Sequence, residues 1–270
     1  MRISGENEVF RCLLLDESIF CSEVVLLGPH TLPLQDILTQ YYRNLVPELT
    51  RALPPARHIS SPLLLSVRRE YESARRRLLI VGQETHNWYA TIDFLKQVAN
   101  PVEKLQSCYE RFELGRCYQK SFFCKVTHEI QNKLEPFVPP LGFMWSNLFP
   151  CDEKGETPSH DVADTLRSFR ILPNEIAILQ PDAIILFTGP NYDYTLQCYF
   201  PGVIPKQIVS DIPNRQLAQL THKDLRPLTF RTYHPSYLRR SRKLWYVDLI
   251  VDAVKKTWVA ETRKDLKGAS

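Results

Sequence analysis

The sequence predicts an α/β protein, with helices on both faces of a central, mostly parallel sheet. Four short apolar runs have the character of strands buried on both faces, and stretches with helical periodicity separate them along the chain. Strands that alternate with helices form parallel sheets. We therefore expect a three-layer α/β/α sandwich with a four-stranded sheet, preceded by N-terminal helices.

The expected strands are short runs of aliphatic and aromatic residues, each followed by polar or turn-forming residues. The first covers residues 78–81 and stops at Gly82. The others cover residues 142–149, 183–188 and 228–233. Ligands of open parallel sheets bind at the carboxyl ends of the strands, so the residues behind each run are the candidates for a site.

Five other stretches have the apolar spacing of helices: 34–53, 62–76, 121–134, 161–179 and 243–258. Pro54 ends the first of them, and Pro173 interrupts the fourth. We expect an α/β domain over residues 77–260 and a C-terminal tail over 261–270. Residues 1–76 form an expected N-terminal helical region, packed on the α/β domain. The chain length permits the N-terminal region to be an integral part of the fold or an attachment that adds specificity.

Composition excludes several classes of protein. The 34 Lys and Arg against 30 Asp and Glu give a net charge of +4, which permits a nucleic-acid partner without requiring one. No apolar run approaches the roughly 18 residues of a membrane span, and the first ten residues lack the apolar core of a secretory signal. The seven cysteines contain no C-x-x-C pair. We expect a cytoplasmic protein with reduced thiols, no metal, no cofactor and no membrane partner.

Polar and ionisable residues directly follow the expected strands. The first strand leads into Gly82-Gln83-Glu84-Thr85-His86-Asn87-Trp88-Tyr89, and the second carries Asn147 near its end. The third ends at Thr188-Gly189-Pro190-Asn191. The fourth leads into His234-Pro235-Ser236-Tyr237, followed by a run in which four of six residues are basic, 238–243.

In their order, spacing and strand context, these segments resemble the motifs of the uracil-DNA glycosylase superfamily. Members of that superfamily carry a GQDP-like motif after the first strand, an Asn at the end of the second and an H-P-S motif after the last. The matching segments here are Gly82-Gln83-Glu84-Thr85, Asn147 and His234-Pro235-Ser236. Residues 179–189 also resemble the third strand and its lead-in, so the resemblance covers about residues 77–258.

The resemblance implies a monofunctional DNA glycosylase, which flips a base out of DNA and hydrolyses its N-glycosidic bond to leave an abasic site. Glu84 would stabilise the oxocarbenium-like sugar and orient the attacking water. His234 would donate a hydrogen bond to O2 of the leaving base. Asn147 would read the edge of the flipped base.

The remaining site residues follow from the same resemblance. Gly82, Gln83 and His86 would line the base pocket, and Trp88 or Tyr89 would stack on the base. The phosphates of single- or double-stranded DNA would be gripped by the segment after the last strand, with Tyr237 or Leu238 as the wedge that fills the vacated stack. Its DNA-binding residues would be Ser236, Tyr237, Leu238, Arg239, Arg240, Arg242 and Lys243.

Three departures from the superfamily pattern bear on the substrate. Glu84 stands where Asp is usual, which changes the water geometry. Thr85 and His86 stand where uracil enzymes carry Pro-Tyr, the Tyr of which excludes bases with a C5 substituent. The four cysteines of the iron–sulfur branch are not recognisable. The implied substrate is uracil or a modified pyrimidine, including the hypermodified cytosines of phage DNA that some members excise in anti-phage defence. We expect a monomer.

Each assignment has a structural alternative. Glu84 could cap a helix, Asn147 could close a turn, and His86 could be a surface turn residue. Trp88 and Tyr89 could be core residues.

The basic run could be a solvated helix start, although Arg at a helix N-terminus is unfavourable and a phosphate partner would explain it better. The alternative for the whole chain is a catalytically inactive nucleic-acid-binding module of the same fold. A nucleoside hydrolase is a weaker reading, because a free nucleoside has no phosphates for the basic run.

Overall fold

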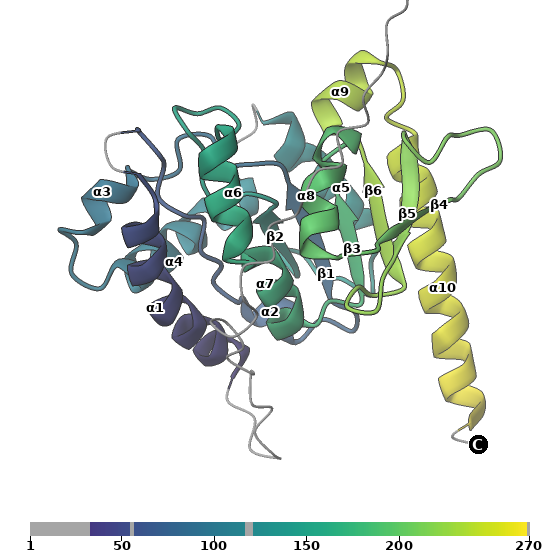
Figure 1. Ribbon diagram of the computed structural model, residues 1–270. Coiled ribbons are helices and arrows are strands. Elements are labelled where there is room, and N and C mark those ends of the chain that lie inside the picture. Colours follow the sequence, from purple (N-terminus) through teal and green to yellow (C-terminus); the bar gives the residue numbers. More distant parts are fainter. Residues whose placement is uncertain (1–32, 55–56, 117–120, 269–270) are drawn as a thin grey trace, which may run out of the picture. The chain divides into compact units, whose positions relative to one another are not determined.

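The structure, a computed structural model, describes residues 33–54, 57–116 and 121–268, and a mixed sheet of six strands in these ranges forms its centre (Figure 1). The strand order is β2-β1-β3-β6-β5-β4. The four parallel strands are the four expected from the sequence. They are β1 (Leu78–Gly82), β2 (Phe143–Asn147), β3 (Ala183–Leu186) and β6 (Leu228–Thr232).

The expectation of a four-stranded sheet is wrong, because two antiparallel strands extend it beyond β6. These are β5 (Leu217–Thr221) and β4 (Ile204–Gln207). Polar residues interrupt both strands, since β5 carries Gln219 and Thr221 and β4 carries Lys206 and Gln207, so neither is an unbroken apolar run. The outermost strand, β4, is largely exposed and carries Pro205 and Lys206, residues that protect a sheet edge from pairing with another chain.

Several helices agree with the sequence periodicity. Helix α1 (Leu34–Ala52) and helix α5 (Phe122–Lys133) confirm the expected stretches 34–53 and 121–134. The stretch 161–179 forms α6 (His160–Ser168) and α7 (Ile171–Leu179). Four helices were not among the expected stretches: α3 (Ile92–Leu95), α4 (Pro101–Phe112), α8 (Asp193–Tyr199) and α9 (Pro235–Arg240). Of these, α4 buries Val102, Leu105 and Tyr109 at helical spacing, a periodic signal that the prediction overlooked.

Two helix boundaries differ from expectation. The break between α6 and α7 falls at Arg170, which has a positive φ of 49°, and Pro173 lies in the first turn of α7, where a missing N–H costs little. The last helix, α10 (Tyr246–Gly268), begins later than residue 243 and runs through most of the expected tail 261–270. Residue 260 is therefore not the end of the folded chain.

The expected helix over residues 62–76 is wrong. Of that stretch, only α2 (Arg69–Glu72) is helical, and the residues before it form a buried, extended segment. The backbone N–H groups of Ser61 and Leu63 donate to the carbonyl oxygens of Ala90 (2.6 Å) and Pro150 (2.8 Å). A short apolar run that is buried on all sides has no periodicity by which a helix could be distinguished from an extended segment.

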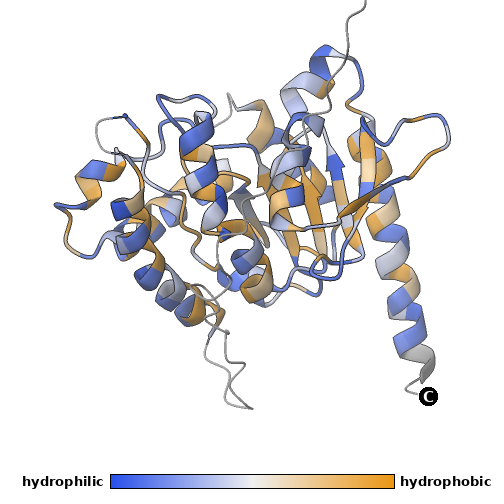
Figure 2. Cartoon of the chain, in the orientation of Figure 1, coloured by the Kyte–Doolittle hydropathy of each residue, from blue (hydrophilic) through white to orange (hydrophobic). Residues whose placement is uncertain are grey.

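Helices cover both faces of the sheet. In Figure 1, α6, α7 and α8 lie in front of the strands, and α5 and α10 lie behind them. Helix α10 contacts both α5 and β6, and α6 contacts α8. Figure 2 shows the hydrophobic residues concentrated in the strands and on the helix faces turned toward them, and every residue of β1, β3 and β6 is buried. The core therefore consists of two apolar layers, one on each side of the sheet.

A buried carboxyl group joins α1 to the rest of the fold. Glu175 on α7 is 1% exposed, and its two oxygens accept hydrogen bonds from Tyr42 of α1 (2.6 Å) and Ser146 of β2 (2.5 Å). The Tyr42 hydroxyl also accepts from the backbone N–H of Leu65 (3.2 Å). Residues 34–66 of the expected N-terminal region thus share polar contacts with the α/β core, while residues 1–32 lie outside the described part of the chain.

Glu175 should give the protein a pH-dependent stability. Burial raises its pKa from 4.5 to about 7, against the lowering effect of the Ser146 and Tyr42 hydrogen bonds. A raised folded pKa means that the folded state holds the proton that the unfolded state has lost. The free energy of unfolding of the wild type, relative to Glu175→Gln, should fall by roughly 3 kcal/mol as the pH rises from about 4.5 to about 7.

Urea unfolding at a series of pH values measures this difference. The exposed Glu129→Gln is the matched control and should show no comparable pH dependence. A constant difference between the wild type and Glu175→Gln over this pH range would show that Glu175 ionises normally in the folded protein.

Among the helices of the described ranges, none is both long and apolar enough to cross a membrane.

Candidate active site

The loops after the four parallel strands lie along one edge of the sheet. Gly82 at the end of β1 is in register with Asn147 at the end of β2, and Leu186 at the end of β3 is in register with Arg231 of β6. The backbone N–H of Gly189 donates to the carbonyl oxygen of Thr232 (3.0 Å). This alignment brings the predicted motif residues to a common edge.

A pocket of about 400 Å³ opens at this edge. It lies between the loops that follow β1, β3 and β6, and its volume is in the range of small-molecule sites. Four predicted site residues line it: Gln83, His234, Tyr237 and Arg240. The other lining residues are Thr188, Gly189, Pro190, Asn191, Arg215 and Tyr233.

His234 is held in the pocket as a hydrogen-bond donor. It is the N-cap of α9, and its Nδ1 accepts from the backbone N–H of Ser236 (3.3 Å). Burial, and secondarily the charge of Arg240, lowers the His234 pKa to about 4. The imidazole is therefore neutral near pH 7, and because Nδ1 accepts, the ring proton is on Nε2.

The ring that stacks on His234 is Phe123, which the sequence analysis did not single out. Their ring centroids are 5.5 Å apart with an interplanar angle of 12°. Phe123 lies in the first turn of α5 and also contacts Trp145 (6.0 Å) and Phe187 (6.0 Å). Phe123 thus connects the ring of His234 to the aromatic residues Trp145 of β2 and Phe187, which follows β3.

The two aromatic residues that we expected to stack on a base lie elsewhere. Trp88 is half-buried and packs edge-on against Phe112 and Trp145. Tyr89 is 39% exposed and contacts Phe94. Neither of the two lines the pocket. The core alternative therefore fits Trp88, and Tyr89 is a surface residue with a positive φ.

Glu84 is held beside the pocket by two hydroxyl groups. Tyr192 donates to its Oε2 (2.6 Å), Thr157 donates to its Oε1 (3.1 Å), and the two hydroxyl oxygens are 3.1 Å apart. Burial raises the pKa of Glu84, and both hydrogen bonds oppose that shift. Glu84 does not line the pocket itself, although its neighbour Gln83 does.

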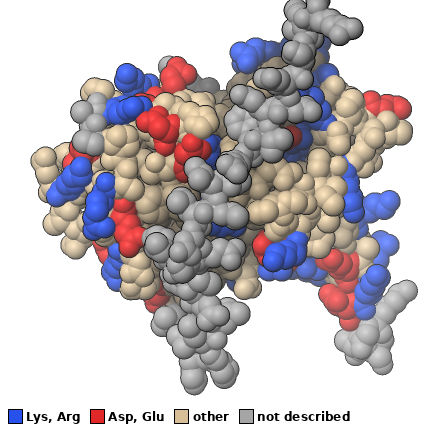
Figure 3. All heavy atoms as spheres, in the orientation of Figure 1, with Lys and Arg blue, Asp and Glu red and all other residues tan. Residues whose placement is uncertain are grey.

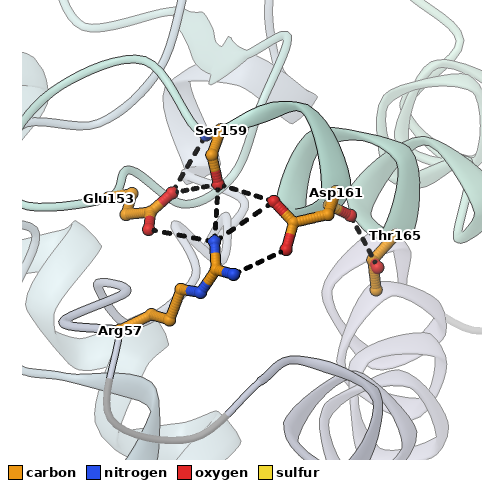
Figure 4. Close-up of polar contacts among 5 residues, drawn as sticks. All are labelled: Arg57, Glu153, Ser159, Asp161 and Thr165. Atoms are coloured by element: carbon orange, nitrogen blue, oxygen red, sulfur yellow. Dashed lines mark hydrogen bonds and ion pairs between the residues drawn. The ribbon is translucent and has the colours of Figure 1, made fainter.

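The loop that carries Thr157 is fixed by a network of charged and polar contacts (Figure 4). Arg57 forms ion pairs with Asp161 (3.1 Å) and Glu153 (3.8 Å) and donates to Ser159 Oγ (3.3 Å). The backbone N–H of Ser159 donates to Glu153 (2.9 Å). These contacts bracket Thr157 on both sides, so its position relative to Glu84 is defined by the fold.

Asn147 is buried at the end of β2, outside the pocket lining. Its Oδ1 accepts from Trp145 Nε1–H (3.1 Å), and its Nδ2 is buried with no hydrogen-bond partner in the described part of the chain. A Cβ added to Gly82 would lie 2.3 Å from Asn147 Oδ1. Gly82 is thus required for the approach of the Asn147 side chain, and the alternative in which Asn147 closes a turn does not apply.

Thr85 and His86 are turned away from the pocket. Thr85 is buried, and its hydroxyl donates to Asp152 Oδ2 (2.7 Å). His86 is exposed, and its Nδ1 is 2.7 Å from the carbonyl oxygen of Gly155, whose N–H donates to Asp152 Oδ1 (2.7 Å). His86 is therefore not a lining residue of this pocket, contrary to our assignment of it to the base pocket.

The segment after His234 corrects two expectations. Leu238 is 0% exposed, so it cannot act as a wedge without leaving the core. Arg239 and Arg240 lie in the last turn of α9, where the helix dipole favours positive charge. These two arginines are therefore not at a helix start, and their positions need no phosphate partner to explain them.

Other members of the predicted DNA-binding set remain on the surface. Tyr237 is 44% exposed and Arg242 is exposed, while Ser236 and Lys243 are half-buried. The Lys243 ammonium donates to Gln216 (2.6 Å). Figure 3 shows basic side chains at the top of the view, where α9 lies.

In the described ranges, no group of three His, Cys, Asp or Glu side chains is placed so that it could hold a metal ion. Cys124 and Cys151 are buried and Cys108 and Cys198 are half-buried, all as free thiols. The other three cysteines lie outside the described residues.

No protein-family model matches the chain, and no curated protein matches its sequence.

Proposed function

We propose that the chain is a monofunctional DNA glycosylase of the uracil-DNA glycosylase type, which hydrolyses the N-glycosidic bond of uracil or a modified pyrimidine in DNA. The observation that carries the proposal is the neutral His234, whose Nε2–H is available in a pocket shared with Gln83, the residue directly before Glu84. The three-layer arrangement of helices about the parallel strands supports it.

The proposed reaction uses two groups of this chain and a water molecule. The C1′–N1 bond breaks and its electron pair leaves with N1 of the base. Glu84 stabilises the positive charge that develops on the sugar, and a water oxygen forms the new bond to C1′ while its proton passes to Glu84 and then to solvent. His234 donates through Nε2–H to O2 of the base, where negative charge gathers.

DNA would reach the site over α9. Tyr237 and Arg240 line the pocket and are exposed, and Arg242 is exposed nearby in the sequence. Tyr237 remains the candidate wedge, and Arg240 the candidate phosphate contact. The protein would act as a cytoplasmic monomer, either in repair of uracil or in defence against phage DNA that carries hypermodified cytosine.

Base release measured by mass spectrometry tests the proposal. The purified protein is incubated with uracil-containing DNA, unmodified DNA, and phage DNA that carries hydroxymethylated or glucosylated cytosine. We expect a free base from one of them and an abasic site in the DNA. Binding of all these DNAs without release of any base would contradict the proposal.

One observation favours the alternative, a catalytically inactive nucleic-acid-binding module. Both carboxylate oxygens of Glu84 already accept hydrogen bonds, from Thr157 and Tyr192, as those of a purely structural carboxylate would. The two functions differ in the response to Glu84→Gln. A glycosylase would lose base release in this variant. A binding module would keep its DNA affinity and would show no base release before or after the substitution.

Tyr192→Phe should lower the rate of base release about tenfold with little change in KM. The variant removes the hydrogen bond that orients Glu84 Oε2, and since that bond opposes the rise in the Glu84 pKa, the acid limb of the pH–rate profile should move to higher pH. Tyr194→Phe, two residues away and 58% exposed, is the matched control. An unchanged acid limb in Tyr192→Phe would show that Tyr192 does not act through Glu84.

A further inference from the structure

The side chain of Asn147 has a fixed orientation. Trp145 and Asn147 are two residues apart on β2, so they lie on the same face of the strand, and the indole Nε1–H donates to Asn147 Oδ1 (3.1 Å). The same oxygen faces Gly82, where there is no room for a Cβ. The carbonyl side of the amide is therefore enclosed by the indole and by β1.

The amino side of the same amide has no partner. Asn147 is 3% exposed, and its Nδ2 is buried without an acceptor among the described residues. A buried donor left unpaired is unfavourable, because it has lost its hydrogen bonds to water and gained none in the protein. A ligand that brings an acceptor to Nδ2 would recover this cost, whereas a ligand that brings a donor would not.

We infer that Trp145 is a specificity-determining residue, which fixes the Asn147 amide as a donor and thereby selects bases with an acceptor at ring position 3, the cytosine type, over bases with N3–H, the uracil type. The inference rests on the proposed function, since it takes Asn147 to face the flipped base. It narrows the substrate to pyrimidines with the Watson–Crick edge of cytosine.

A uracil-type base would require the opposite amide orientation. Rotating the Asn147 amide would place Nδ2 against the Trp145 Nε1–H, so that two donors would face each other and the existing hydrogen bond would be lost. Sites that reject a ligand by leaving a buried polar group unpaired discriminate strongly. The cytosine edge also suits the reaction, because the leaving anion spreads its charge over O2 and N3, where His234 and Asn147 would each donate.

Three pairs of duplex oligonucleotides test the inference, each pair differing only at positions 3 and 4 of the target base. The pairs are cytosine with uracil, 5-methylcytosine with thymine, and 5-hydroxymethylcytosine with 5-hydroxymethyluracil. Base release is measured by mass spectrometry for each member. Within any pair that is cut, we expect the cytosine-type base to be released about 10²-fold faster or more.

Trp145→Phe removes the indole N–H and should reduce that ratio at least tenfold, because the Asn147 amide becomes free to rotate. Trp258→Phe is the matched control, since it makes the same substitution at a buried tryptophan that packs on Phe137, and it should leave the ratio unchanged. Thermal unfolding of both variants shows whether they are folded.

A binding measurement separates this inference from the proposed function. Oligonucleotides with 2′-fluoroarabino nucleotides resist hydrolysis, and their affinities are measured by fluorescence anisotropy for the cytosine-type and uracil-type members. Release of a uracil-type base as fast as its cytosine-type partner, or a ratio that Trp145→Phe leaves intact, overturns the inference alone. If no base is released but the cytosine-type oligonucleotides bind more tightly, the glycosylase activity is overturned and the recognition of the base edge by Asn147 is not. If no base is released and the two types bind equally well, both proposals are overturned.

Discussion

Glu84→Gln is expected to lower the rate of base release by about 10³-fold while DNA binding persists. Gln keeps the size of the side chain and can accept from either Tyr192 or Thr157, so the loop geometry should survive. What the variant loses is the negative charge that stabilises the sugar cation and accepts the proton from water. Single-turnover kinetics and an anisotropy assay measure the two effects separately.

The matched control is Glu156→Gln, which removes an exposed negative charge close enough to Glu84 to raise its pKa. It should leave the rate within about twofold of the wild type. If Glu84→Gln behaved like this control, the carboxylate would have a structural role and base release would not depend on its negative charge.

His234→Ala is expected to reduce base release by about 10²–10³-fold, the cost of removing one donor from an oxyanion site. His234→Gln should recover part of the rate, because a side-chain amide can still donate. His160→Ala, at a histidine 84% exposed on α6, is the control.

The pH dependence gives a second readout of His234. With a folded pKa of about 4, the imidazole is neutral over the range in which histidines usually titrate, so base release should show no inflection from His234 between about pH 5 and 8. An inflection near pH 6.5 that disappears in His234→Gln would show that the ring is solvated and titrates normally.

The sequence predicted the parallel strands because each is buried on both faces and reads as an unbroken apolar run. Strand β4 escaped prediction because it is largely exposed, and β5 because Gln219 interrupts its buried residues, so neither is an unbroken apolar run. A helix over residues 62–76 was predicted from Pro62 at its start and the arginines 75–77 at its end, but the buried residues 62–66 have no periodicity that distinguishes a helix from a non-helical backbone.

The site was predictable to the extent that it lies on strand ends. Gln83, Asn147 and His234 directly follow buried strands, and the structure brings them to one edge of the sheet. Phe123 and Tyr192 reach the same edge through tertiary contacts across more than 100 residues, 111 from His234 and 108 from Glu84 by numbering, and no local pattern signals such a contact.

The contacts of Glu175 indicate which residues a shortened fragment of this protein must retain in order to fold. A fragment that began at residue 77 would remove Tyr42 and Leu65, leave the buried acid of α7 with one partner instead of two, and expose the apolar face on which α1 packs. Ser146, the partner that remains, precedes Asn147 on β2, so the damage would reach the strand that carries Asn147. Truncation studies should therefore retain residues 34–66 as part of the folding unit.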